Sequence, residues 1–186
     1  MKLDAFLSNY HFSETHEIRI AAPPQAVWNA AMGADLNESV FVKLLMSLRF
    51  LPARLTGKKP PEGQGVALTF DDFAAAGFIK LDEEYPKEFL LGLAGRFWKI
   101  SGELLDLTPA EFLAFEIPGY AKAGWNLTFA EIAPGVTRLS TETRIRCMGA
   151  EARRKFFPYW MLIRPFSGLI RMEMLRIIKK QAENAI

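Results

Sequence analysis

The sequence predicts an α+β fold in which a seven-stranded antiparallel sheet wraps around a long C-terminal helix. Residues 66–148 hold six short segments of strand-like character, separated only by turn signals such as AAAG, PK, PG and APGV. Close spacing without intervening helices is typical of an antiparallel sheet. A seventh alternating segment, HEIRIAAPP, precedes them at 16–24, and residues 149–186 repeat apolar side chains at helical spacing.

Two short helices are predicted between the first strand and the later six. Pro23 and Pro24 end the first strand, and because proline suits the opening turn of a helix, a helix is predicted over 23–32. Apolar residues recur at helical spacing over 37–55, which predicts the second helix. The Gly- and Pro-rich stretch 56–65 is predicted to be a loop.

The six later strands are predicted at 66–73, 78–85, 88–95, 111–117, 122–133 and 136–148. The last strand separates its side chains by kind: Leu139, Thr141, Thr143, Ile145 and Cys147 share one face, and Arg138, Ser140, Glu142, Arg144 and Arg146 share the other. We therefore expect the apolar and threonine face to point inward and the charged face to meet water. Small threonine side chains on the inner face favour a curved sheet that encloses a cavity.

The most apolar stretch of the chain is KFFPYWMLIRPFSGLIRMEML at 155–175. A membrane span needs roughly 20 apolar residues with few charges, and Arg164 and Arg171 interrupt this stretch. We expect instead that one stripe of the helix packs on the sheet, and that Pro158 and Pro165 bend the helix or break it into pieces. Other apolar residues lie off the stripe, so a second side would meet the N-terminal helices, a second subunit or a membrane surface.

Length and composition restrict the class of protein. A chain of 186 residues, half of them apolar, suits one domain over 1–186 with an N-terminal extension at 1–15. The net charge of +2 argues against a nucleic-acid partner. Cys147 is the only cysteine, and His11 and His16 are expected in exposed or capping roles, so we expect no metal and no cofactor. The first residues lack an apolar signal core, which favours a cytoplasmic location.

Three stretches resemble a known superfamily: HEIRIAAPPQAVWNAA at 16–31, GRFWKI at 95–100 and TETRI at 141–145. They are similar to the START-like, birch-pollen-allergen-like proteins, also labelled SRPBCC, which include polyketide cyclase-like members. The resemblance covers nearly the whole chain from about His16. It implies a helix-grip fold with a deep hydrophobic cavity between the sheet and the C-terminal helix. Members bind lipids, sterols, aromatic metabolites or polyketides, and some catalyse reactions there, but no catalytic motif carries over to this chain.

The predicted function is the binding of a hydrophobic or amphiphilic small molecule, of lipid, aromatic-metabolite or polyketide type, in that cavity. The candidate binding residues are Arg96, Trp98, Trp125, Thr141, Thr143, Trp160 and Arg164. Arginine can hold a carboxylate or phosphate through two parallel hydrogen bonds. We expect Arg164 to hold the acidic end of an amphiphile, a contact of roughly 1.5–3 kcal/mol, with Thr141 and Thr143 deeper in. The alternative for each arginine is a structural ion pair, and for each tryptophan a place in the core.

Two other functions stay open. One is an enzyme of the cyclase, aromatase or hydrolase kind that uses the same cavity; its catalytic residues are unknown, and it should show an acid, a tyrosine or a histidine facing inward. The other is an interaction module that forms a homodimer through the outer face of the last helix.

Overall fold

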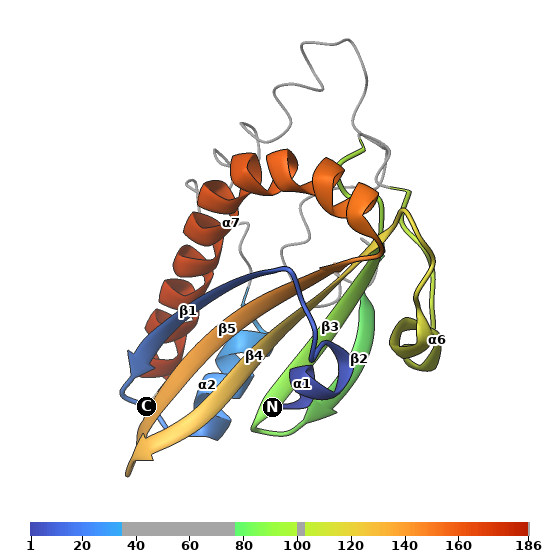
Figure 1. Cartoon of the computed structure of the whole chain (residues 1–186). Helices are drawn as coiled ribbons and strands as arrows, with labels where there is room; N and C mark the ends of the chain where they lie inside the picture. The colour runs from blue at the N-terminus through green and yellow to red at the C-terminus, as the bar shows by residue number, and fades with distance from the viewer. Residues whose placement is uncertain (35–76, 100–102, 186) are drawn as a thin grey trace.

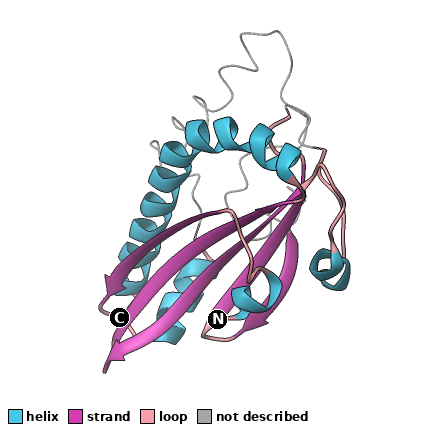
Figure 2. Cartoon of the chain, in the orientation of Figure 1, coloured by secondary structure: helices cyan, strands magenta, loops and turns pink. Residues whose placement is uncertain are grey.

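The structure is a computed structural model that describes residues 1–34, 77–99 and 103–185. In these ranges five strands form one antiparallel sheet in the order β1-β5-β4-β3-β2. The strands are β1 (Phe12–Ile20), β2 (Ile79–Glu84), β3 (Glu88–Gly95), β4 (Ala121–Ala133) and β5 (Val136–Cys147). The helices are α1 (Lys2–Phe6), α2 (Pro24–Met32), α6 (Pro109–Ala114) and α7 (Ala150–Asn184). Figure 1 shows α7 arching over one face of the sheet, and Figure 2 shows the same arrangement by element type.

The predicted α+β class and the long C-terminal helix that grips an antiparallel sheet are confirmed, but the number of strands is wrong. The described residues form five strands, whereas seven were predicted. The predicted strand at 66–73 and the predicted helix at 37–55 lie outside the described residues.

The predicted strand at 111–117 is instead helix α6. The Thr108 hydroxyl accepts a hydrogen bond from the Glu111 backbone N–H, and the Glu111 carboxylate accepts one from the Thr108 N–H. This reciprocal pair is a capping box, and Pro109 fits the first helical position. These local contacts fix a helix start where apolar composition alone suggested a strand.

The N-terminal segment carries more structure than the predicted extension at 1–15. Helix α1 occupies its start, and strand β1 begins at Phe12, four residues before the predicted strand at His16. Leu3 and Leu7 are buried against the sheet at Gly124, where an added Cβ would lie 2.7 Å from a methyl group of each leucine. Glycine at this position therefore lets α1 lie directly on the strand.

Both faces of the sheet are covered. The inner face packs Phe89, Leu91 and Leu127 against α2 and the second half of α7. The outer face carries a separate apolar cluster that includes Leu3 of α1 and Phe112 of α6. The prediction that the charged face of β5 meets water is therefore wrong in part.

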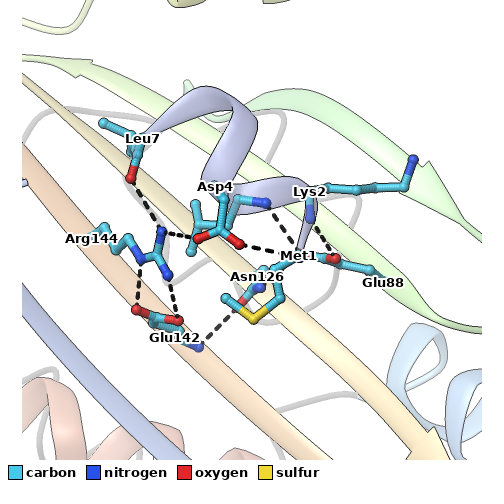
Figure 3. A network of polar contacts seen from close by, with 9 residues as sticks. Met1, Lys2, Asp4, Leu7, Glu88, Asn126, Glu142 and Arg144 are labelled. Atoms are coloured by element: carbon cyan, nitrogen blue, oxygen red, sulfur yellow. Dashed lines mark hydrogen bonds and ion pairs between the residues drawn. The ribbon is translucent and has the colours of Figure 1, made fainter. Parts of the chain in front are cut away.

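Arg144 lies in the part of the outer face that α1 shields from solvent. Its side chain is only 9% exposed beneath α1, and it donates to Asp4 Oδ1 at 2.6 Å, to Glu142 Oε1 at 2.7 Å and to the Leu7 carbonyl at 3.2 Å. Figure 3 shows these contacts beside a second group, in which Glu88 accepts from Asn126 and from the Lys2 backbone N–H. The two groups tie α1 to β3, β4 and β5.

Helix α7 runs without a break from Ala150 to Asn184 although Pro158 and Pro165 lie inside it. Each proline removes one backbone donor, which bends a helix without necessarily ending it. Figure 1 shows the resulting curve, which lets α7 follow the sheet. Within the described part of the chain, no helix has the length and apolar character that crossing a membrane requires.

Candidate functional site

The inner face of β1 is divided into three zones along the strand. Phe12 begins an aromatic zone, Glu14 and His16 form a polar zone, and Ile18 and Ile20 begin an aliphatic zone. These alternate residues share one face because strand side chains repeat every two positions. β1 is the edge strand next to α7, so the helix passes over all three zones.

Helix α7 supplies the matching side chains. In the aromatic zone the Phe12 ring lies 5.2 Å from the Phe156 ring and 5.9 Å from the Trp160 ring. In the aliphatic zone Met174 and Ile178 pack in the same cluster as Ile20. Between these two groups, Gly168 of the helix faces the polar zone.

The polar zone joins β1, β5 and α7. Thr143 and Thr141 of β5 are the cross-strand partners of Glu14 and His16. Gly168 of α7 lies directly above the pair: an added Cβ would be 2.7 Å from Glu14 Oε1 and 3.2 Å from His16 Nε2. The missing side chain at Gly168 therefore allows the helix to approach the two polar side chains closely.

Charged groups meet in this zone with little direct pairing. His16 Nε2 lies 3.2 Å from Glu14 Oε1, with side chains 20% and 9% exposed, and no aligned hydrogen bond joins the two atoms. Arg164 Nε lies 3.9 Å from the same Glu14 oxygen, too far for a hydrogen bond. Arg171 is attracted by Glu14 electrostatically.

Four buried side-chain atoms in the described part of the chain lack a hydrogen-bond partner, and all four belong to this zone. They are Glu14 Oε2, His16 Nε2, Thr143 Oγ1 and Arg171 Nη1. A buried polar atom without a partner costs about 1–3 kcal/mol, and more when it is charged. Four such atoms from three elements at one place indicate a polar site that the described residues do not complete by themselves.

Arg171 is the least compensated of these groups. Burial lowers the pKa of its guanidinium to about 10, and the attraction of Glu14 opposes that shift only in part. The group is therefore still a cation at neutral pH, and it carries its charge into the space between sheet and helix.

The chemistry of the zone has two components. A guanidinium with an unpartnered, buried N–H, in the same zone as an unpartnered hydroxyl group, can hold an anionic oxygen. A histidine beside a carboxylate has the composition of a general base with its orienting partner. Both components face inward, next to aromatic side chains.

The structure brings four of the seven predicted binding residues to or beside the polar zone. Thr143 and Thr141 lie in it, and Trp125 Nε1 donates to Thr141 Oγ1 at 2.5 Å. Arg164 lies at its rim with a side chain that is 54% exposed. The acid beside it is Glu14, 3.9 Å away, whereas Glu142 lies on the other face of the sheet and binds Arg144.

The other three predicted residues lie elsewhere. Trp98 and Trp160 belong to the aromatic zone, where each ring contacts Phe156. Arg96 is held by its own chain: it donates to the Gly119 carbonyl at 3.1 Å and to Glu103 at 2.9 Å, and it covers the Tyr120 ring at 4.2 Å. That geometry matches the structural alternative for Arg96.

Sequence reasoning missed Glu14, His16 and Arg171. The first two would follow from strand alternation had the strand been extended back to Phe12, since Phe12, Glu14, His16 and Ile18 then share a face. Arg171 lies seven residues after Arg164, which is two helical turns on the same side. How deeply its side chain lies depends on how closely α7 packs against β1. The spacing of residues along the sequence does not predict that distance.

Hollows on the surface of the described part of the chain include two that do not lie between the sheet and α7. One, of about 760 Å³, lies near the start of α7 and includes His11, Glu116 and Arg146. The other, of about 300 Å³, lies along the last turns of α7. The hydrophobic cavity between sheet and helix stays a prediction. The described residues also hold no group of three or more His, Cys, Asp or Glu side chains arranged to bind a metal.

Comparison with known proteins shows similarity only at the level of solved structures. No family model matches the chain, and no curated protein matches it. A conserved protein from Geobacillus kaustophilus shares 13% identity at a TM-score of 0.45, over 94% of this chain and 97% of that one. CalU16 from Micromonospora echinospora shares 16% at 0.30, over 92% and 84%. The Zhui aromatase/cyclase from Streptomyces shares 17% at 0.31, over 92% and 93%. Because all three TM-scores are below 0.5, these similarities assign neither a family nor an activity.

Proposed function

We propose that this protein binds an amphiphilic small molecule between the sheet and α7, with the polar end of the molecule in the polar zone. The convergence of four buried, unpartnered polar atoms carries this proposal. Each such atom lowers the stability of the unliganded fold, and proteins tolerate that cost mainly at functional sites. A ligand that donates to Glu14 and accepts from Arg171 and Thr143 would remove most of it.

The apolar part of the ligand would lie against the aromatic zone. Phe12 and Glu14 are alternate residues on one face of β1, so a molecule anchored at Glu14 reaches Phe12, Phe156 and Trp160 directly. An apolar wall with a few polar anchors is the usual form of a small-molecule site. Lipid, aromatic-metabolite and polyketide ligands all have this character, and Arg164 at the rim would contact their acidic end.

The experiment is native mass spectrometry of the purified protein, with organic extraction of the same sample and titration with Nile red, a neutral hydrophobic dye. We expect a co-purified small molecule or saturable dye binding, weakened by Phe12→Ser. The change Leu162→Ser, at a more exposed position of α7, serves as the control. A folded protein that yields neither a bound molecule nor saturable dye binding would overturn the proposal.

A second candidate is an enzyme that uses the same zone, and the inward-facing Glu14 and His16 favour it. An acid or histidine facing inward is the feature that an enzyme in this position requires. In a hydrolase His16 would take a proton from water as that water attacks an acyl carbon, and Glu14 would stabilise the charged imidazole.

Hydrolysis of p-nitrophenyl decanoate tests this candidate. We expect His16→Gln to abolish any turnover above background and His11→Gln, the only other histidine in the chain, to leave it intact. Turnover that is the same in the wild type and in His16→Gln would exclude ester hydrolysis by this pair.

A further inference from the structure

We propose that the polar zone recognises a hydroxy carboxylic acid, with the carboxylate on Arg171 and Thr143 and the neighbouring hydroxyl on Glu14. This inference rests on the proposed ligand-binding function and names the chemical class of the ligand's polar end. It depends on the charges and on the direction of the unmade hydrogen bonds.

The charges of the zone favour a single negative charge on the ligand. Arg171 and Arg164 are cations on α7, and Glu14 is an anion on β1. These three charges sum to one positive charge. A carboxylate balances it, whereas a phosphate dianion would leave one negative charge in excess.

The side-chain atoms without hydrogen-bond partners indicate which further polar groups the ligand should carry. Arg171 Nη1 can only donate, and Thr143 Oγ1 can donate. The zone therefore offers two hydrogen-bond donors, one from α7 and one from β5. Glu14 Oε2 can only accept when ionised. A carboxylate accepts from the two donors, and an adjacent hydroxyl donates to the acceptor.

Direct pairing between Arg171 and Glu14 does not account for these atoms. The two groups attract each other, but Arg171 Nη1 and Glu14 Oε2 each lack a hydrogen-bond partner in the described structure. A structural ion pair in a buried place is stabilising only when its hydrogen bonds are made. The cation and the anion therefore face the same zone with hydrogen-bonding capacity left over, and Gly168 brings α7 so close that an added Cβ would lie 2.7 Å from Glu14 Oε1.

The test compares three ligands with the same tail: decanol, decanoate and 2-hydroxydecanoate. Each displaces Nile red from the wild type, Arg171→Met, Thr143→Val, Glu14→Met and Arg154→Met, an exposed arginine of the same helix. We expect both acids to bind at least about tenfold more tightly than decanol. Arg171→Met should weaken decanoate by about 10- to 100-fold, as expected for the loss of a charge-assisted hydrogen bond, while Arg154→Met changes nothing.

The hydroxyl contact has its own comparison. 2-Hydroxydecanoate should bind several-fold more tightly than decanoate to the wild type, and Glu14→Met should remove that difference. Near-ultraviolet circular dichroism of each variant reports whether the fold is retained, and the ligand comparison in the wild type does not depend on any variant.

The possible failures are distinguishable. If Nile red and all three ligands fail to bind the folded wild type, the proposed function itself is wrong. If decanol binds as tightly as decanoate, or if Arg171→Met and Arg154→Met behave alike, the protein binds amphiphiles but the carboxylate assignment is overturned. Equal affinity of the wild type for the two acids would overturn the hydroxyl contact.

Discussion

Two arginines lie on opposite sides of the sheet, Arg144 buried on the outer side and Arg171 of α7 partly buried on the inner side, and their surroundings differ. Arg144 on the outer face binds Asp4, Glu142 and the Leu7 carbonyl. Burial alone would lower the pKa of its guanidinium, but its hydrogen bonds to Glu142 and Asp4 outweigh that effect and raise the pKa. Arg171 of α7 has an unpartnered, buried Nη1, and burial lowers its pKa to about 10.

The comparison distinguishes an arginine with a structural role, Arg144, from an arginine whose hydrogen-bonding capacity is available to a ligand, Arg171. On the outer face the buried polar groups satisfy one another, and the result holds α1 against the sheet (Figure 3). On the inner face the buried polar groups leave their hydrogen bonds unmade at a single place. Removing a group of the first kind should damage the fold, and removing one of the second kind should damage binding.

The largest expected effect comes from Arg144→Met. It leaves the Glu142 carboxylate, 15% exposed, without its buried counter-charge and detaches Asp4 from the sheet. We expect a loss of about 3 kcal/mol in the free energy of unfolding, because removing one member of a buried ion pair leaves the other uncompensated. Urea denaturation monitored by circular dichroism measures it.

Arg171→Met is the matched comparison. It removes a partly buried cation that makes no hydrogen bond through Nη1, and it leaves Arg164 within 3.9 Å of Glu14 as a remaining counter-charge, so we expect the free energy of unfolding to change by less than about 1 kcal/mol in the absence of ligand. Equal losses for the two variants would mean that Arg171 is a structural residue, and the distinction between the faces would fail.

Much of the fold follows from local patterns. The alternation in β5 correctly places Thr141 and Thr143 inward, because period-two patterns depend only on the chain. The helix over 149–186 follows from its spacing for the same reason. The number of strands did not follow, because the Thr108–Glu111 capping box makes a helix of a segment whose composition suits a strand.

The site follows only in part. The threonines and Arg164 could be predicted because their faces are set locally. The burial of Arg144 depends on α1, more than 130 residues away, packing across Gly124. The depth at which Arg171 lies depends on the close approach of α7 to β1 at Gly168. Contacts of this kind, between segments far apart in the sequence, produce no repeating pattern of residues from which they could be predicted.

The next largest effect is expected from Gly168→Ala, which tests whether the polar zone on the inner face contacts the ligand. Alanine favours a helix by about 1 kcal/mol over glycine, and its Cβ displaces the flexible ends of Glu14 and His16, so the free energy of unfolding should change by less than about 1 kcal/mol. Decanoate affinity should fall about tenfold because the polar zone is shifted. Isothermal titration calorimetry measures it, with Ser167→Ala in the same turn as control. Unchanged affinity would show that the ligand does not contact this zone.

A smaller effect is expected from Arg164→Met. The side chain is 54% exposed and its contact with Glu14 is 3.9 Å long, so solvent screens its charge. Decanoate affinity should fall by no more than about fivefold, less than the sequence predicted, because exposed charge pairs contribute roughly 0.2–1 kcal/mol. A loss as large as that of Arg171→Met would identify Arg164 as the main anchor. Equal affinity with a lower unfolding temperature would make it structural.

The smallest effect concerns His11, which accepts a hydrogen bond from the Cys147 backbone N–H at Nδ1, 3.1 Å away. Burial, then Arg153 and Arg146, lower the pKa of His11 below its ordinary value. The unfolded chain therefore takes up a proton before the folded chain does, and stability falls as the pH drops below about 6.5 until the folded-state pKa is passed. We expect His11→Gln, which keeps an acceptor but does not titrate, to unfold at the same temperature as the wild type at pH 7.5 and at a higher temperature at pH 5. Its binding of Nile red should be unchanged, since His11 contacts the end of β5 and lies outside the polar zone. Parallel unfolding temperatures at the two pH values would show that His11 does not contribute to the pH dependence of stability.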